Sequence, residues 1–212
     1  YTKEPRLSPA DLEVNLTKPV SIMSELHDER QKFIQGGSYF EDSAQANYPF
    51  SYSWTKKKVS NILRDTNAPH RPIVKIVKLF DVYGEDDSRP KLMNLLADHF
   101  SSRHNPTLFL SSPDKLFFPI HIDDVVHTLL EAEDKPGQDF TAAPHRAVSL
   151  AEVVELFRFH SKNSGNIAWR QKNLVKQDPI FEKCFTGSNQ RVELGEGIVR
   201  LLAWRKKVAR HG

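Results

Sequence analysis

Residues 72–80 carry the sequence P-I-V-K-I-V-K-L-F, which is the strongest strand signal in this chain of 212 residues. Four of these residues are β-branched, and β-branched side chains favour the extended backbone of a strand. Before this stretch, the run K-F-I-Q-G-G at residues 32–37 predicts a second buried strand that ends in glycines. We also expect short strands at residues 107–110 and 117–122.

Segments with helical periodicity alternate with these strands. Apolar residues at helical spacing predict helices at residues 10–27, 53–65, 90–103, 123–133, 150–160 and 193–208. Ser149 and Glu152 have the spacing of a capping box at the start of the fifth helix. Strands that alternate with helices of this length predict βαβ units and a mainly parallel sheet.

The residues that directly follow the two best strands are candidates for chemistry. In a parallel α/β sheet, ligands bind beyond the carboxyl ends of the strands. Ser38 follows the first strand, and Asp81-Val82-Tyr83-Gly84 follows the second. These positions are therefore the first places to look for a site.

Tyr52 and Lys56 are four residues apart in the sequence Y-S-W-T-K, so both side chains lie on one face of the expected helix. A lysine ammonium near a phenol stabilises the phenolate and lowers the pKa of a tyrosine from about 10 toward neutrality. Such a tyrosine can exchange a proton with a substrate hydroxyl or carbonyl group. A chain with five tyrosines and many lysines can also contain this spacing by chance, so the surrounding sequence has to decide.

Six segments surround and include this pair in a definite order. They are V-N-L-T (14–17), K-F-I-Q-G-G-S (32–38), Y-S-W-T-K (52–56), L-F-D-V-Y-G (79–84), I-D-D-V-V (122–126) and L-G-E-G-I (194–198). With these segments the chain resembles the extended short-chain dehydrogenase/reductases, and within them the NAD-dependent epimerase/dehydratase family, which modifies nucleotide sugars. The resemblance covers most of residues 14–204.

The resemblance implies an α/β fold with a Rossmann-like parallel sheet. The chain would contain the second half of that sheet, without the N-terminal βαβ part, and a small C-terminal α+β substrate subdomain. Residues 1–88 and 117–145 would form the Rossmann-like core. Residues 89–116 and 146–212 would form the substrate-binding subdomain.

The resemblance also implies roles for individual residues. Tyr52 would be the catalytic acid/base, and Ser38 would hydrogen-bond the reacting sugar oxygen. Lys56 would lower the pKa of Tyr52 and, together with it, bind the cofactor at the nicotinamide ribose. Phe80 and Val82 would lie along the nicotinamide of NAD or NADP.

Four further residues are candidates for substrate binding. Asp81 occupies the position that faces the substrate diphosphate in the family. Arg89, Lys91 and Lys115 could supply positive charge to that diphosphate, although a solvated surface charge is the preferred interpretation of each.

The sequence departs from the family pattern in its glycines. None of its nine glycines forms the G-x-x-G-x-x-G turn that holds a pyrophosphate, and the acidic residue expected to bind the adenosine ribose is also absent. Asp81 would in addition repel a diphosphate. We therefore expect either a piece of a longer enzyme or a remnant that cannot grip a dinucleotide.

Two function hypotheses follow. The first is an NAD(P)-dependent epimerase, dehydratase or reductase that acts on a nucleotide sugar by coupling proton transfer at Ser38, Tyr52 and Lys56 to hydride transfer. The second is a cofactor-free, catalytically inactive module that contacts proteins or nucleic acid. For either hypothesis, a homodimer could form through a helix pair that includes residues 53–65.

The composition fits a globular protein, with 39% hydrophobic and 27% charged residues. A net charge of +3 is too small to indicate a nucleic-acid-binding protein. Residues 158–176 contain five basic and no acidic residues, for which a solvated face is the preferred interpretation.

Several other classes of site are not expected. The single cysteine, Cys184, excludes an internal disulfide and fits a reducing compartment, so we expect a cytoplasmic protein. No apolar run of about 18 residues could span a membrane. His121 and Asp123 share one strand face, but no third ligand accompanies them, so no metal site is expected.

Overall fold

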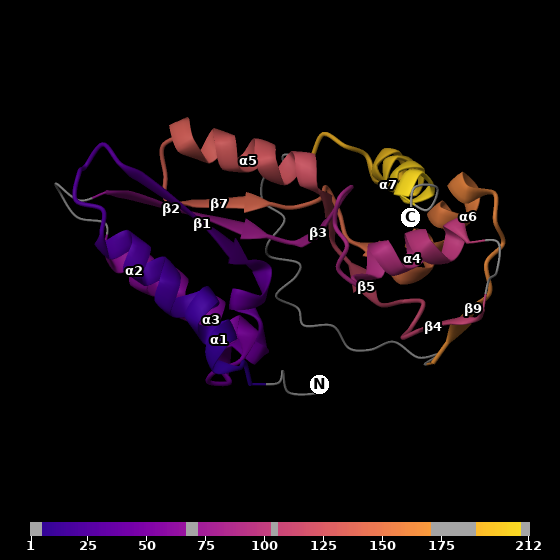
Figure 1. Cartoon of the computed structure of the whole chain (residues 1–212), viewed down its shortest axis with the longest axis horizontal. Coiled ribbons are helices and arrows are strands. Elements are labelled where there is room, and N and C mark those ends of the chain that lie inside the picture. The colour runs from indigo at the N-terminus through magenta and orange to yellow at the C-terminus, as the bar shows by residue number, and fades with distance from the viewer. Residues whose placement is uncertain (1–5, 67–71, 103–105, 171–189, 209–212) are drawn as a thin grey trace. The chain divides into compact units, whose positions relative to one another are not determined.

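The computed structural model describes residues 6–66, 72–102, 106–170 and 190–208 (Figure 1). Within these ranges the chain forms two compact units. The first unit contains residues 6–66, 72–80 and 126–142, and the second contains residues 81–102, 106–125, 143–170 and 190–208. By packing, residues 81–88 and 117–125 thus belong to the second unit, whereas the sequence analysis assigns them to the core. The functional division into domains stays a prediction.

The first unit is built on a parallel sheet of three strands. These are β1 (Lys32–Ser38), β2 (Ile73–Leu79) and β7 (Asp139–Ala142), in the order β1-β2-β7. β1 and β2 pair along their whole lengths, from Lys32 opposite Ile73 to Ser38 opposite Leu79. The two strands with the strongest sequence signals are therefore neighbours, and their carboxyl ends meet.

Helices cover both faces of this sheet (Figure 1). α1 (Pro9–Leu12), η1 (Glu13–Thr17), α2 (Lys18–Ser24) and α3 (Tyr52–Asp65) lie on one face, and α5 (Ile122–Asp134) lies along the other. The core on the α2 and α3 face consists of Met23, Val59, Leu63, Val74 and Ile76, which are all at most 5% exposed. Two short 3₁₀ turns, η2 (Tyr39–Asp42) and η3 (Ala44–Asn47), connect β1 to α3.

The single helix expected at residues 10–27 is interrupted at its centre. Residues 13–17 form one turn of π-helix, in which the Lys18 N–H donates to the Glu13 carbonyl. Pro19 follows directly, and a proline inside a helix lacks an N–H and crowds the carbonyl four residues earlier. The wider turn relieves that crowding, which explains why α1 and α2 are separate.

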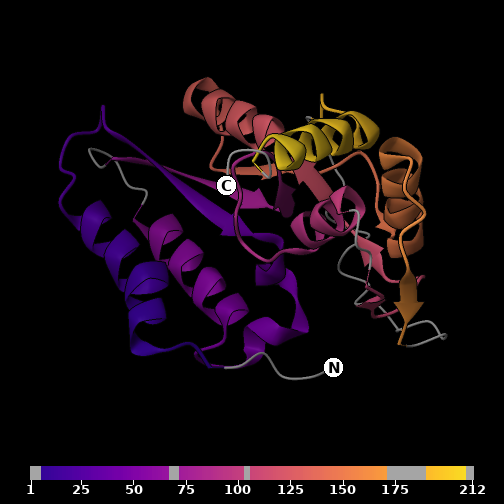
Figure 2. The ribbon, with the colours of Figure 1, turned by 45° about the vertical axis from the view of Figure 1, so that its right-hand side comes forward.

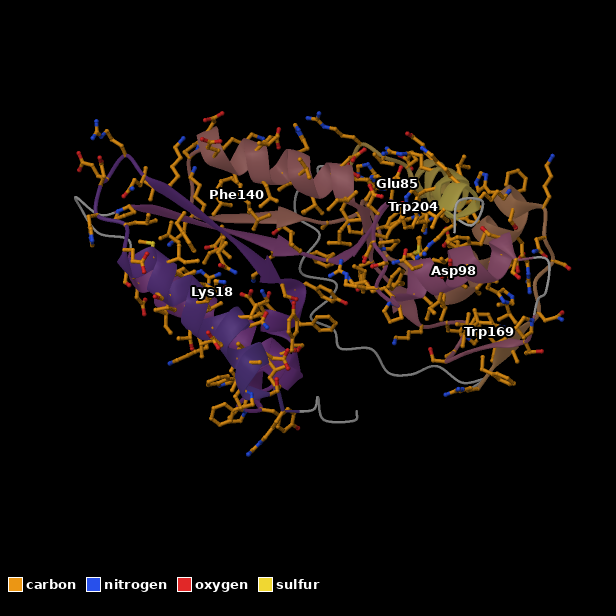
Figure 3. All side chains as sticks on the ribbon, viewed as in Figure 1. Lys18, Glu85, Asp98, Phe140, Trp169 and Trp204 are labelled. Atoms are coloured by element: carbon orange, nitrogen blue, oxygen red, sulfur yellow. The ribbon has the colours of Figure 1, made fainter. Side chains whose placement is uncertain are left out.

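A buried lysine fastens α5 to the sheet. Lys75 lies on the central strand β2 and is 5% exposed. Its Nζ donates to the carbonyl of Lys135, directly after α5, and lies 5.4 Å from the centre of the Phe140 ring. Phe140 is labelled in Figure 3. The ammonium thus neutralises the negative end of the α5 dipole while its stem fills apolar space.

The second unit combines three helices with short strand pairs. α4 (Leu92–Ser101), α6 (Leu150–Ser161) and α7 (Leu194–Val208) pack together (Figure 2). Their shared core includes Leu96, Phe100, Phe157, Ile198 and Leu201. β3 (Asp81–Tyr83) pairs in parallel with β6 (Pro119–His121), β4 (Leu108–Leu110) in parallel with β9 (Ile167–Trp169), and β5 (Leu116–Phe117) antiparallel with β8 (Val148–Ser149).

Only the serine half of the expected capping box is found at α6. The Ser149 hydroxyl accepts the Glu152 N–H at 3.1 Å, as predicted. The Glu152 carboxylate instead pairs with the Arg146 guanidinium, which is the stronger partner for an anion.

Candidate functional site

The end of β1 places Ser38 in a defined orientation. Ser38 is 5% exposed, and its hydroxyl oxygen accepts the Phe40 N–H at 3.3 Å. Glu41 completes the reciprocal cap, because its Oε1 accepts the Ser38 N–H at 2.8 Å. The 3₁₀ turn η2 therefore holds the Ser38 side chain at the strand end.

The start of α3 places Tyr52 and Lys56 one helical turn apart. Ser51 caps the helix by accepting the Trp54 N–H at 3.1 Å, which makes the exposed Tyr52 the first helical residue. Lys56 is partly buried, and its Nζ donates to the Gly36 carbonyl at 3.3 Å. The same Nζ lies 5.8 Å from the centre of the Tyr52 ring.

The contact between Lys56 and Gly36 puts Tyr52 and Ser38 at the same end of the sheet. α3 connects two parallel strands and so runs opposite to β1. Tyr52 lies four helical residues before Lys56, about 6 Å along the axis. Ser38 lies two strand residues beyond Gly36, about 7 Å in the same direction. The hydroxyls of Ser38 and Tyr52 thus belong to one edge, the edge at which ligands bind in α/β sheets.

Buried charges surround this edge. Burial lowers the pKa of Lys56, and the nearby Glu41 carboxylate acts against that lowering. Glu41 itself is 2% exposed. Burial raises the pKa of Glu41, although the Ser38 N–H, the Ser60 hydroxyl and the charges of Lys78 and Arg64 act in the opposite direction.

Phe80 lies in an aromatic stack. The rings of Phe80 and Tyr39 are 4.7 Å apart and nearly parallel, at 6°. Phe40 stacks on Tyr39 with ring centres 4.2 Å apart. The ring of Phe80, expected along the nicotinamide, therefore has one face against a tyrosine.

The other predicted residues belong to the second unit. The Asp81 Oδ2 accepts the Phe118 N–H at 3.0 Å, so this carboxylate supports the β3 and β6 pair. Arg89 Nε lies 2.7 Å from the Asp87 carboxylate. Burial and the Arg89 charge lower the pKa of Lys91. Lys115 is exposed.

A cavity of about 410 Å³ brings some of these positions together. Residues 82–89 and Ile122 line it. Val82 and Arg89 are thus neighbours of one cavity, whereas Asp81, Lys91 and Lys115 do not line it.

Sequence reasoning overlooked Glu41 as a site residue. The spacing of Ser38 and Glu41 is that of a capping box, S-x-x-E, and this pattern could have revealed the contact. The same pattern gives no sign that the carboxylate is buried.

Two kinds of site have no counterpart in the described part of the chain. There, no three His, Cys, Asp or Glu side chains are grouped so that they could hold a metal ion. Likewise, none of the described helices is both long and apolar enough to cross a membrane. Cys184 and residues 171–176 of the basic stretch lie outside the described residues.

No protein-family model matches the sequence, and no curated protein matches it either. Solved structures do match the fold. RMD from Pseudomonas aeruginosa, complexed with NADPH, aligns with a TM-score of 0.75 at 12% identity, over 97% of this chain and 80% of that one. The UDP-glucose 4-epimerase from Thermotoga maritima, with UDP-glucose, aligns with a TM-score of 0.73 at 14% identity, over 94% and 72% of the two chains.

A third match is the dTDP-glucose 4,6-dehydratase from Bacillus anthracis, in complex with NAD. It has a TM-score of 0.73 at 15% identity, over 96% of this chain and 71% of that one. The predicted fold class is thereby confirmed: the chain has the Rossmann-like α/β fold of nucleotide-sugar epimerases and dehydratases, as its resemblance to the extended short-chain dehydrogenase/reductases implies.

Proposed function

We propose that this chain carries the proton-transfer half of an NAD(P)-dependent enzyme that acts on a nucleotide sugar, as an epimerase, dehydratase or reductase. The observation that carries the proposal is the Lys56 contact with Gly36, which brings Tyr52 to the strand end where Ser38 lies. The shared fold supports it, because similar structures contain NAD, NADPH or UDP-glucose.

In this proposal, Tyr52 is the acid/base that exchanges a proton with the substrate. Its ring is exposed at the helix start, so a substrate hydroxyl can reach the phenol. Ser38 would hold the same sugar oxygen by a hydrogen bond. The Lys56 ammonium beside the Tyr52 ring would stabilise the phenolate after the proton has left.

The residues present fit the nicotinamide-ribose end of a dinucleotide. Lys56 and Tyr52 offer donors at the strand end for ribose hydroxyls, and Phe80 and Val82 are the proposed neighbours of the nicotinamide. The bound cofactor would supply or accept the hydride. The 212 residues contain no glycine-rich turn for the pyrophosphate, so other groups would have to hold that part.

The remaining substrate contacts are proposals for the second unit. Arg89, Lys91 and Lys115 would provide positive charge for the diphosphate. Asp81 would act through its hydrogen bond to Phe118, which shapes the strand end. We also keep as proposals a cytoplasmic location and a homodimer through a helix pair that includes residues 53–65.

Titration of the full chain with NADH and NADPH tests this function. We expect binding to the unchanged chain and a loss of about 10- to 100-fold in affinity for Lys56→Ala, because a charged hydrogen-bond donor is removed. Lys57→Ala is the matched control, since Lys57 is the next residue and is exposed. Nucleotide fluorescence or calorimetry measures both affinities. Equal affinities of Lys56→Ala and Lys57→Ala would contradict the assignment of Lys56.

The second candidate function is a cofactor-free module. It is favoured by the Tyr39 ring, which already covers one face of Phe80. The absence of any NADH or NADPH binding at millimolar concentration would support this alternative over the enzyme.

A further inference from the structure

Glu41 is a buried carboxylate at the proposed reaction edge to which the proposed reaction assigns no task. It is 2% exposed, and its Oε1 accepts the Ser38 N–H. Gly37 makes room for it: a Cβ at residue 37 would lie 2.7 Å from the Glu41 Oε1 and 3.1 Å from Ile76. A side chain at position 37 would therefore displace this carboxylate.

Three cations face Glu41 from the elements packed against it. They are Lys56 and Arg64 on α3 and Lys78 on β2, and their charges interact electrostatically with the Glu41 carboxylate. Arg64 is 2.7 Å from the Asp139 carboxylate, and Lys78 is 2.6 Å from Asp42, the acidic neighbour of Glu41. Arg64 and Lys78 thus have their own carboxylate partners, whereas Lys56 donates to a main-chain carbonyl.

The cost of burying Glu41 argues against a role as a simple cap. The hydrogen bond of a capping-box glutamate to the cap N–H does not itself require the carboxylate to be buried. Removing a carboxylate from water destabilises the folded chain unless its partners compensate fully. Burial raises the pKa of Glu41, so its partners do not compensate fully.

We propose that Glu41 is a positioning residue of this site, which fixes Ser38 through its N–H and holds a buried negative charge that attracts the Lys56 ammonium beside Tyr52. The consequence for catalysis rests on the proposed function, but the hydrogen bond to Ser38 and the attraction to Lys56 do not. Burial alone disfavours the charged form of Lys56, and the Glu41 carboxylate is the group that opposes this effect. The pair would thereby set the pH range in which Tyr52 can lose its proton.

The test measures the titration of Lys56 itself, by competitive acetylation of the full chain at a series of pH values and peptide mass spectrometry. Glu41→Gln keeps an oxygen that can accept the Ser38 N–H and removes the charge. We expect the Lys56 titration to move to lower pH, with acetylation at neutral pH about tenfold faster, as for the loss of an opposite charge nearby. Asp42→Asn, which changes the exposed neighbour, is the control and should leave Lys56 unchanged.

An unchanged Lys56 titration in folded Glu41→Gln would overturn the inference. If Glu41→Gln does not fold, Glu41→Asp is the deciding variant, because it keeps the charge but moves it back by one methylene group. The titration of Lys56 is expected to move to lower pH in this variant too. An unchanged titration would again overturn the proposal. Acetylation needs no cofactor. A shifted Lys56 titration without any NADH binding would therefore refute the proposed function while supporting the attraction between Glu41 and Lys56. NADH binding with an unshifted Lys56 titration would do the opposite.

Discussion

Each of the two units contains a cluster of ionisable residues, and the clusters are compensated in different ways. In the second unit, Glu85 accepts Arg200 Nε at 2.8 Å and the His121 Nε2 at 3.1 Å (Glu85 is labelled in Figure 3). Arg200 Nη1 is also 2.8 Å from the Asp123 carboxylate. In the first unit, Glu41 and Lys56 each bind a main-chain group of β1.

The difference separates charges that stabilise the fold, in the second unit, from charges that can still interact with a ligand, in the first unit. His121 Nδ1 accepts the Asp123 N–H at 3.2 Å, so its other nitrogen carries the proton and donates to Glu85. Every member of this second cluster therefore has a side-chain partner. Main-chain groups are dipoles rather than full charges, so they neutralise the charges of Glu41 and Lys56 only in part. The remaining electrostatic potential can act on a bound ligand.

The largest effect on stability is expected from a substitution that disturbs the cluster of the second unit, at Gly197. A Cβ at residue 197 would lie 2.1 Å from the Tyr83 hydroxyl oxygen, and the buried Tyr83 ring packs edge-on against His121. Gly197→Ala should therefore lower the free energy of unfolding by about 2–3 kcal/mol, as overpacking does. Urea denaturation measures this loss.

Gly195→Ala is the matched control for Gly197→Ala. It lies two residues earlier in the same helix, and its Cβ would meet only the end of the His160 side chain, at 3.1 Å. Alanine also favours a helix over glycine by about 1 kcal/mol. Equal losses at the two positions would mean that the contact with Tyr83 is unimportant.

The next effect concerns Glu85 and Glu41, whose pKa values are shifted in opposite directions. Burial would raise the pKa of Glu85, but hydrogen bonds from the main chain and Arg200 outweigh it and lower that pKa. Glu85 thus stabilises the fold above its ordinary pKa of about 4.3, and this stabilisation is lost as the pH falls through the folded value. The pKa of Glu41 is raised, so ionising Glu41 costs stability as the pH rises above that ordinary value.

Glutamine variants should therefore change stability in opposite directions. At pH 7, Glu85→Gln should lower the free energy of unfolding by about 0.5–1 kcal/mol, a small value because Arg200 is partly solvated. Glu41→Gln should raise it. Urea titrations from pH 7 to pH 4 should show both differences shrinking toward the acid end. A loss of stability in Glu41→Gln at pH 7 would show that the two carboxylates are alike.

The sequence predicted the elements whose signal is local. The β-branched run became β2, and the apolar run that ends in glycines became β1. β7 was not expected, because D-F-T-A has little strand signal of its own and becomes a strand by pairing with β2, for example Thr141 with Lys78. The interruption of the first helix depends on Pro19, whose effect the apolar periodicity does not register.

The candidate site divides in the same way. Ser38, Tyr52 and Lys56 could be named from the order of their segments, and their roles stay predictions. The burial of Glu41 could not be anticipated, because it arises from the packing of α3 on the strand end and from the missing side chain of Gly37. The spacing of Ser38 and Glu41 predicts a capping box, but the burial of the Glu41 carboxylate depends on tertiary packing.

The smallest effect concerns backbone strain, which again differs between the units. Phe50 in the first unit and Asp86 in the second both have positive φ, 64° and 61°. Aspartate adopts this conformation readily, whereas a bulky residue pays about 1–2 kcal/mol for it. Phe50 precedes the cap of α3, and its ring contact with Trp54, 5.4 Å between centres, helps to hold it there.

Phe50→Ala and Phe50→Gly both remove the Phe50 ring and differ only in the Cβ that is strained at positive φ. The glycine variant should therefore be the more stable of the two by about 0.5 kcal/mol, since part of the relief is offset by the greater freedom of glycine in the unfolded chain. Thermal denaturation of the two variants side by side measures this difference. Equal stabilities would mean that no strain is stored two residues before Tyr52, the first residue of its helix. A more stable glycine variant would place backbone strain beside the proposed proton donor, where strain is commonly tolerated for the sake of function.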